Sequence, residues 1–133
     1  MICGLDEISS ISKKILKEVP NGGIVLLSGD LASGKTTLVK NFVKEIGLDV
    51  DVCSPTFLIL NSYQDRVFHY DIYMDGVKKF IQSGLLENLD KEGWHFIEWA
   101  DEDLKKILNS YGYNFLSIDI KSVDDKREYS FAA

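Results

Sequence analysis

One short segment constrains the fold more than any other: the stretch Gly29–Thr36, which separates two apolar segments of different period. Before it, residues 24–27 form a continuous apolar run of strand length. After it, apolar residues recur at the spacing of one helix face, and Gly47 supplies a stop signal: Leu38, Val39, Phe42, Val43 and Ile46. The order of strand, glycine loop and helix predicts an α/β domain.

The rest of the chain supplies further helices and strands for such a domain. We expect helices over residues 8–19, with Asp6 as the N-cap, over about 77–89, and over 100–111, with Gly112 just past its end. A short strand is predicted at 94–99, and hairpins at 56–73, around Gln64-Asp65, and at 114–131, around a polar turn at 122–126. At 133 residues, we expect residues 1–133 to form a single domain with a central mixed sheet flanked by helices.

Composition excludes several classes of function. The net charge of −6 makes the chain a poor candidate for gripping DNA or RNA alone, because phosphate neutralisation needs clustered Lys and Arg. No apolar run is long enough to cross a bilayer, and the first residues lack the pattern of a secretion signal, so we expect a cytoplasmic protein with no membrane partner. Cys3 and Cys53 lack the spacing of a zinc or redox pair, which favours reduced, non-functional thiols.

The segment Gly29–Thr36 fits the pattern G-x-x-x-x-G-K-[ST] at every required position. Such a loop turns consecutive backbone N–H groups towards phosphate oxygens, and the following helix adds its positive N-terminal end. Lys35 is predicted to reach the β- and γ-phosphates of ATP, and the Thr36 hydroxyl to bind Mg²⁺. The predicted nucleotide contacts are Asp30, Leu31, Ala32, Ser33, Gly34, Lys35, Thr36 and Thr37.

Hydrolysis or transfer of phosphate also needs a carboxylate near Mg²⁺ and a group that orients the attacking oxygen. Asp71 and Glu98 each end an apolar strand, so both are expected at the crevice beyond the carboxyl ends of the sheet. Trp99, directly after Glu98, is a candidate lining residue of that crevice. The loop Ser54-Pro55-Thr56 offers a fixed φ and a hydroxyl, as a phosphate-sensing switch segment does.

Two metal-site alternatives are weaker. The segment 71–76 starts like a calcium loop, but Tyr73 and Gln82 occupy positions that need a carboxylate. His69 and His95 lie in strand-like segments without a ligand partner at helical spacing, so we expect both to be packed or hydrogen-bonded histidines.

Four motifs in order, G-D-L-x-x-G-K-T-T, S-P-T-F, H-x-D-x-Y and I-E-W, resemble those of the bacterial tRNA threonylcarbamoyladenosine biosynthesis ATPases, the TsaE or YjeE family. The resemblance extends from about Ile24 to the closing hairpin. It implies a small P-loop ATPase that binds and slowly hydrolyses ATP with two partner proteins, TsaB and TsaD. Those partners support threonylcarbamoyl transfer to the adenosine beside the anticodon, so contact with tRNA is expected only through the complex.

Carried onto this chain, the resemblance implies that Lys35 and Thr36 hold phosphate and Mg²⁺, and that residues 54–56 form a switch-like loop. It makes Asp71 and Glu98 the essential carboxylates and metal-site residues, with Trp99 in the same motif. Asp71 fits a role close to Mg²⁺ and Glu98 the positioning of water, although the resemblance does not fix this division.

The chain departs from the family pattern at two places. Ala32-Ser33 replaces the usual inner Gly-Ala of the loop, and Met74 replaces an arginine after H-x-D-x-Y. Two other functions fit a phosphate loop: a small-molecule kinase and a nucleotide-dependent binding switch without significant catalysis. The kinase is disfavoured because its lid arginines have no counterpart, since the only two arginines are Arg66 and Arg127.

Overall fold

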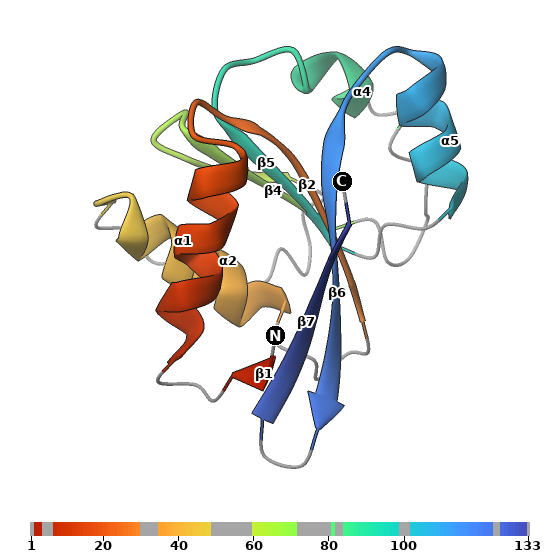
Figure 1. The fold of residues 1–133 in the computed structure, drawn as a ribbon. Coiled ribbons are helices and arrows are strands. Elements are labelled where there is room, and N and C mark those ends of the chain that lie inside the picture. The colour runs from red at the N-terminus through yellow and green to blue at the C-terminus, as the bar shows by residue number, and fades with distance from the viewer. Residues whose placement is uncertain are drawn as a thin grey trace.

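The computed structural model describes residues 2–3, 7–29, 35–48, 60–71, 81, 84–98, 102–123 and 126–132. Within these residues, helices cover both faces of one seven-stranded sheet (Figure 1). The strands are β1 (Ile2–Cys3), β2 (Gly23–Gly29), β3 (Leu60–Tyr63), β4 (Val67–Asp71), β5 (Trp94–Glu98), β6 (Phe115–Val123) and β7 (Lys126–Ala132). The helices are α1 (Ile8–Glu18), α2 (Lys35–Glu45), α4 (Leu85–Asn88) and α5 (Glu102–Ser110). The predicted α/β class with a mixed central sheet is confirmed.

Strand β2 lies at the centre of the sheet, whose order is β1-β7-β6-β2-β5-β4-β3. Strands β6, β2, β5 and β4 are parallel to one another, whereas β1, β3 and β7 pair antiparallel with their neighbours. The register aligns Leu27 of β2 with Glu98 of β5, and Glu98 with Asp71 of β4. The segments that leave these three strands therefore start from one edge of the sheet, where ligands bind in open α/β folds.

Alternation along β2 divides the core into two apolar clusters. Val25 and Leu27 pack with α1 and α2 on one face, whereas Ile24 and Leu26 pack with α4 and α5 on the other. Phe42 of α2 contacts the rings of Trp94 and Phe96 edge-on, with centroid distances of 5.4 and 5.0 Å. This contact fixes α2 against β5.

Most predicted elements are confirmed within the described residues. Gln64 and Asp65 both have φ of 52°, as the central residues of a tight hairpin turn between β3 and β4 require. The second hairpin is also present, but its turn is shorter than the predicted 122–126. Ser122 pairs with Arg127 and Val123 with Lys126, because polar residues fit the partly exposed end of β6 that extends past its pairing with β2.

Three elements, β1, α4 and α1, differ from the predictions or continue beyond the described residues. Strand β1 was not predicted, because two residues are too short to show a period. Helix α4 begins after Gly84, which has a φ of 72°. Of the predicted helix over 77–89, residues 77–80 and 82–83 lie outside the described residues, and Ile81 is helical. Helix α1 begins at Ile8 with Glu7 at its cap position, and the predicted cap Asp6 lies outside the described residues.

A seam of backbone atoms closes the edge of the sheet where β2 and β5 begin. The N–H of Gly23 donates to the carbonyl of Gly93 at 3.0 Å, and the N–H of Trp94 donates to that of Arg66 at 2.9 Å. A Cβ atom on Gly22 would lie 2.5 Å from the Gly93 carbonyl oxygen, and one on Gly93 would lie 2.4 Å from that of Arg66. Glycine is therefore required at both positions to let the chain segments approach.

Candidate functional site

Lys35 occupies the first position of α2, directly after the glycine loop, and its side chain is buried, with 3% relative exposure. Its Nζ donates a hydrogen bond to the backbone carbonyl of Gly29 at 2.9 Å. Gly29 is the last residue of β2 and has a φ of 143°, a conformation that favours glycine. The ammonium group therefore lies between the two ends of the loop, at the carboxyl edge of the sheet.

Thr36 connects α2 to the neighbouring strand. Its hydroxyl donates a hydrogen bond to Oε2 of Glu98 at 3.1 Å. Glu98 ends β5 and is 3% exposed, so its carboxyl group is almost completely withdrawn from water. A buried carboxyl group needs such donors to offset its lost hydration. The predicted carboxylate and the predicted metal ligand are thus in direct contact.

His69 adds a second contact to the same oxygen. Its Nε2 lies within hydrogen-bonding distance of Glu98 Oε2, and the ring is completely buried. The sequence predicted a packed or hydrogen-bonded histidine here, which is confirmed, but did not link it to Glu98. Two signals were available: His69 is the first residue of the H-x-D-x-Y motif, and strand alternation places it on the same face as Asp71, two residues further along.

Several predicted site residues lie outside the part of the chain that the structure describes. These are Asp30, Leu31, Ala32, Ser33 and Gly34 of the loop, the segment Ser54-Pro55-Thr56, and Trp99. Met74, which follows the third motif, also lies outside the described residues. Asp71 is described as a strand residue aligned with Glu98, without a side-chain description. Thr37 is exposed on α2. The described core of the site is therefore Lys35, Thr36, Glu98 and the additional residue His69.

The side chains present fit magnesium, which prefers oxygen ligands. A hydroxyl that donates its hydrogen to a carboxylate still has lone pairs for a cation, and Thr36 makes that contact with Glu98. Within the described ranges, no three His, Cys, Asp or Glu side chains form a group that could hold a metal by itself. The contact of Thr36 with Glu98 offers one hydroxyl and one carboxylate, which suits an ion that keeps other ligands, such as waters or phosphate oxygens.

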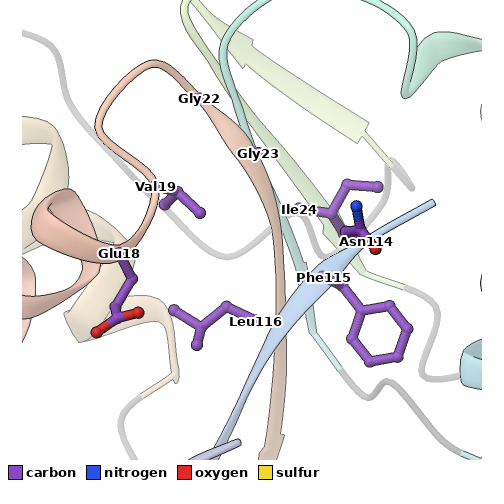
Figure 2. Close-up of a pocket in the computed structure, with 8 residues that line it drawn as sticks. All are labelled: Glu18, Val19, Gly22, Gly23, Ile24, Asn114, Phe115 and Leu116. Atoms are coloured by element: carbon purple, nitrogen blue, oxygen red, sulfur yellow. The ribbon is translucent and has the colours of Figure 1, made fainter. Parts of the chain in front are cut away.

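A cavity of about 280 Å³ lies at the opposite end of β2 from the loop (Figure 2). It is lined by the first residues of β2 and β6 and by the end of α1: Glu18, Val19, Gly22, Gly23, Ile24, Asn114, Phe115 and Leu116. Figure 2 shows that Phe115 and Leu116 point to opposite sides of β6. This cavity is separate from Lys35 and Glu98, which lie at the carboxyl edge.

A second buried polar group lies on the α4/α5 face of the sheet. His95 Nε2 donates to the carbonyl of Lys91 at 2.8 Å, so His95 Nδ1 accepts from the Tyr70 hydroxyl at 2.7 Å. The Tyr70 oxygen in turn accepts from Nδ2 of Asn88 at 2.7 Å. Burial lowers the pKa of His95 and raises that of Tyr70. Both groups are thereby kept neutral.

The central strand β2, the glycine loop, the buried lysine and the carboxylate on the adjacent parallel strand define a protein of the P-loop NTPase-like class. A solved structure supports this fold. The crystal structure of YdiB from Bacillus subtilis is similar to this chain, with a TM-score of 0.69 and 28% sequence identity. The similarity covers 100% of this chain and 84% of that one.

Sequence comparisons identify the family within this class. The family model for threonylcarbamoyl adenosine biosynthesis protein TsaE matches residues 4–129. The tRNA threonylcarbamoyladenosine biosynthesis protein TsaE of Bacillus subtilis is 35% identical over 133 residues, covering 96% of this chain and 80% of that protein. Its counterpart in Treponema pallidum is 35% identical over 83 residues, covering 60% and 62%, respectively. The chain belongs to the TsaE family. No described helix is both long and apolar enough to cross a membrane.

Proposed function

We propose that this protein is an ATP-binding, slowly ATP-hydrolysing accessory subunit of a complex that makes threonylcarbamoyladenosine beside the anticodon of tRNA. Its partners in this proposal are proteins of the TsaB and TsaD type. The observation that carries the proposal is the contact of Thr36 with Glu98 next to the buried Lys35, in a chain whose family is named for this modification. These three side chains are the groups that a P-loop site needs for phosphate and magnesium.

In this proposal, Lys35 moves its ammonium group from the Gly29 carbonyl to the β- and γ-phosphates of ATP. Thr36 supplies a hydroxyl oxygen to Mg²⁺, and Glu98 holds that hydroxyl through Oε2. When bound, Mg²⁺ neutralises charge that develops on the phosphate oxygens. The contact between Thr36 and Glu98 favours a role for Glu98 beside the metal, which leaves the orientation of water to Asp71, aligned with it on β4.

The scarcity of arginine supports partner dependence. Phosphate transfer is commonly accelerated by an arginine that stabilises charge in the transition state. Arg66 lies in the hairpin turn at the amino end of β4, with its guanidinium 6.0 Å from the Trp94 ring, at the edge of the sheet away from the phosphate loop. Arg127 lies on β7, which is separated from β2 by β6. A partner that supplies a cation at the carboxyl edge would therefore raise the rate.

The net negative charge of the protein supports contact with tRNA through its partners rather than directly. At a net charge of −6, the protein repels a nucleic-acid backbone as a whole, so the partners carry the tRNA-binding surface in this proposal. Since tRNA modification takes place where tRNA is used, we place the protein in the cytoplasm.

The test of the complex is reconstitution. The protein is mixed with candidate TsaB- and TsaD-type proteins, co-purified, and assayed for ATP hydrolysis as a mixture and as single components. We expect a stable complex whose ATP turnover exceeds that of the isolated protein. Equal turnover with and without the partners would contradict the partner-dependent ATPase.

The nucleotide site is tested by Lys35→Ala. Loss of the ammonium group should weaken ATP binding by at least about 100-fold, because it removes the main positive charge that the protein offers the phosphates. Titration calorimetry measures the affinity, and Lys40→Ala, an exposed lysine of the same helix, is the matched control. Retained affinity in Lys35→Ala would refute the phosphate site.

A further inference from the structure

His69 is a buried polar residue in an otherwise apolar part of the core. It lies on β4 on the face that packs against α1 and α2, where Val67, Phe96 and Leu27 are also buried. The ring is 6.5 Å from the ring of Tyr63, measured between centroids, and is withdrawn from water. An apolar side chain would fill this place without the cost of burying two ring nitrogens.

The two ring nitrogens have different surroundings. Nε2 contacts Oε2 of Glu98, whereas Nδ1 is buried and has no hydrogen-bond partner in the part of the chain that the structure describes. With Glu98 as the carboxylate that the proposed magnesium site requires, Nε2 of His69 carries the hydrogen and donates it, because a carboxylate can only accept. Among the described residues nothing offsets the lost hydration of Nδ1, and a buried polar atom without a hydrogen-bond partner destabilises the folded state. A residue that retains such a cost is commonly one that the site requires.

The contact with Glu98 shows what His69 contributes. Oε2 of Glu98 receives hydrogen bonds from two different elements, Thr36 of α2 and His69 of β4. Two donors from two directions fix the rotation of the carboxyl group about its last bond, which one donor alone leaves free. They also occupy Oε2, so that Oε1, which takes part in neither contact, has a defined direction.

We propose that His69 is a positioning residue that holds the Glu98 carboxylate, and through it the Thr36 hydroxyl, in the orientation that binds magnesium–nucleotide. This inference rests on the proposed function, in which Glu98 and Thr36 form the metal side of the site. His69 contacts neither nucleotide nor metal in this role. It acts as outer-shell partners of metal ligands do, by orienting a group that acts directly.

Two substitutions separate the hydrogen bond from the packing. His69→Leu fills the apolar pocket but has no donor, whereas His69→Gln keeps an amide N–H close to the position of Nε2. The matched control is His95→Leu, which removes the other buried histidine from the opposite face of the same sheet. Thermal unfolding of all variants shows that each is folded at the temperature of the assay.

The first measurement is ATP hydrolysis by the complex with its partners. We expect His69→Leu to lower kcat by about 10- to 100-fold, the usual effect of losing an outer-shell partner, with KM within about threefold of the original value. His69→Gln should recover most of kcat, and His95→Leu should leave it unchanged. A purely structural role for His69 predicts equal losses in His69→Leu and His95→Leu.

The second measurement uses binding without turnover. The affinity for ADP is determined by calorimetry in EDTA and again in Mg²⁺. We expect His69→Leu to bind ADP normally in EDTA but to lose most of the gain that Mg²⁺ gives the original protein. In a Glu98→Gln background, the same substitution should add little further loss, because both changes act through one carboxyl group. Independent, additive losses would overturn the inference.

The third measurement examines the ring itself. Long-range proton–nitrogen NMR spectra of the nucleotide-free protein distinguish a histidine that carries its hydrogen on Nε2 from one that carries it on Nδ1. We expect the Nε2–H form for His69, and the Nδ1–H form would overturn the inference.

If the original protein gains no ADP affinity from Mg²⁺, the proposed function fails and the inference fails with it. If Mg²⁺ raises the ADP affinity of the original protein and that of His69→Leu equally, the proposed function stands and only the inference about His69 fails.

Discussion

The two histidines of this chain lie on opposite faces of the same sheet, both almost completely buried, and their surroundings differ in kind. His95 belongs to a chain of neutral groups in which each ring nitrogen has a partner, Lys91 on one side and Tyr70 on the other. His69 contacts a carboxyl group with one nitrogen and has no partner among the described residues for the other. The His95 network joins neighbouring elements of the fold, whereas His69 contacts Glu98, which also accepts a hydrogen bond from Thr36 at the start of α2.

The difference extends to what each group connects. The network of His95 and Tyr70 reaches Asn88, the last residue of α4, and so attaches that short helix to β4 and β5. The contacts of Glu98 connect β4 and β5 to the start of α2, beside the glycine loop. Polar groups on the α4/α5 face thus hold a helix in place, and those on the α1/α2 face join β4 and β5 to the start of α2 at the carboxyl edge of the sheet.

The largest effect that separates the two faces is expected from Glu98→Gln. Its amide oxygen can still accept from Thr36 and His69, but the negative charge at the proposed magnesium position is lost, so ATP turnover in the complex should fall by about 100-fold. The unfolding temperature should change little. Turnover assays and calorimetric melting check both parts, with Glu102→Gln, an exposed acid of α5, as the control. Unchanged turnover would show that Glu98 has only a structural role.

A smaller effect, on stability alone, is expected from Tyr70→Phe. Losing the hydroxyl leaves Asn88 and His95 without their shared partner, which should cost about 1–3 kcal/mol in the free energy of unfolding. Affinity for ADP in Mg²⁺ should stay the same. Urea denaturation and calorimetry measure the two quantities, and Tyr111→Phe, at an exposed tyrosine, serves as the control. A loss of nucleotide affinity in Tyr70→Phe would mean that the two faces are coupled.

The smallest effect is a dependence of stability on pH. Burial lowers the pKa of His95, so the folded ring stays neutral while the unfolded ring takes up a proton below about pH 6.5. The free energy of unfolding should therefore decrease as the pH falls from 6.5 towards the folded pKa. Comparison with His95→Leu isolates this contribution, because the variant should have a shallower decrease over the same range. Parallel pH curves would contradict the assignment.

Sequence alone was enough for the parts of the site that depend on local order along the chain. The loop Gly29–Thr36 requires a strand before it and a helix after it, and the structure has β2 and α2 in those places. Asp71 and Glu98 each follow an apolar run, which predicts the end of a strand, and the register aligns them. These features follow from short-range patterns that neighbouring residues reinforce.

The contact of His69 with Glu98 could not be predicted in the same way. It depends on the alignment of β4 with β5, two strands separated by more than twenty residues, and no pattern within either strand determines that register. The same limit applies to the length of the second hairpin, where Ser122 and Lys126 read as turn residues but pair within the strands. The end of β6 extends past Ile120, its last residue paired with β2, and is partly exposed, so it accepts polar residues and polarity alone does not mark where the strand ends.

The glycine seam at the amino edge of the sheet has a consequence for how this sequence can vary through evolution. The atom that excludes a side chain at Gly22 is a backbone carbonyl oxygen of Gly93, and the atom that excludes one at Gly93 is a backbone carbonyl oxygen of Arg66. Every amino acid carries that oxygen, so no substitution at a neighbouring position can make room. We therefore expect both positions to remain glycine. At position 66 the side chain can change, because only the backbone carbonyl of Arg66 takes part in this contact.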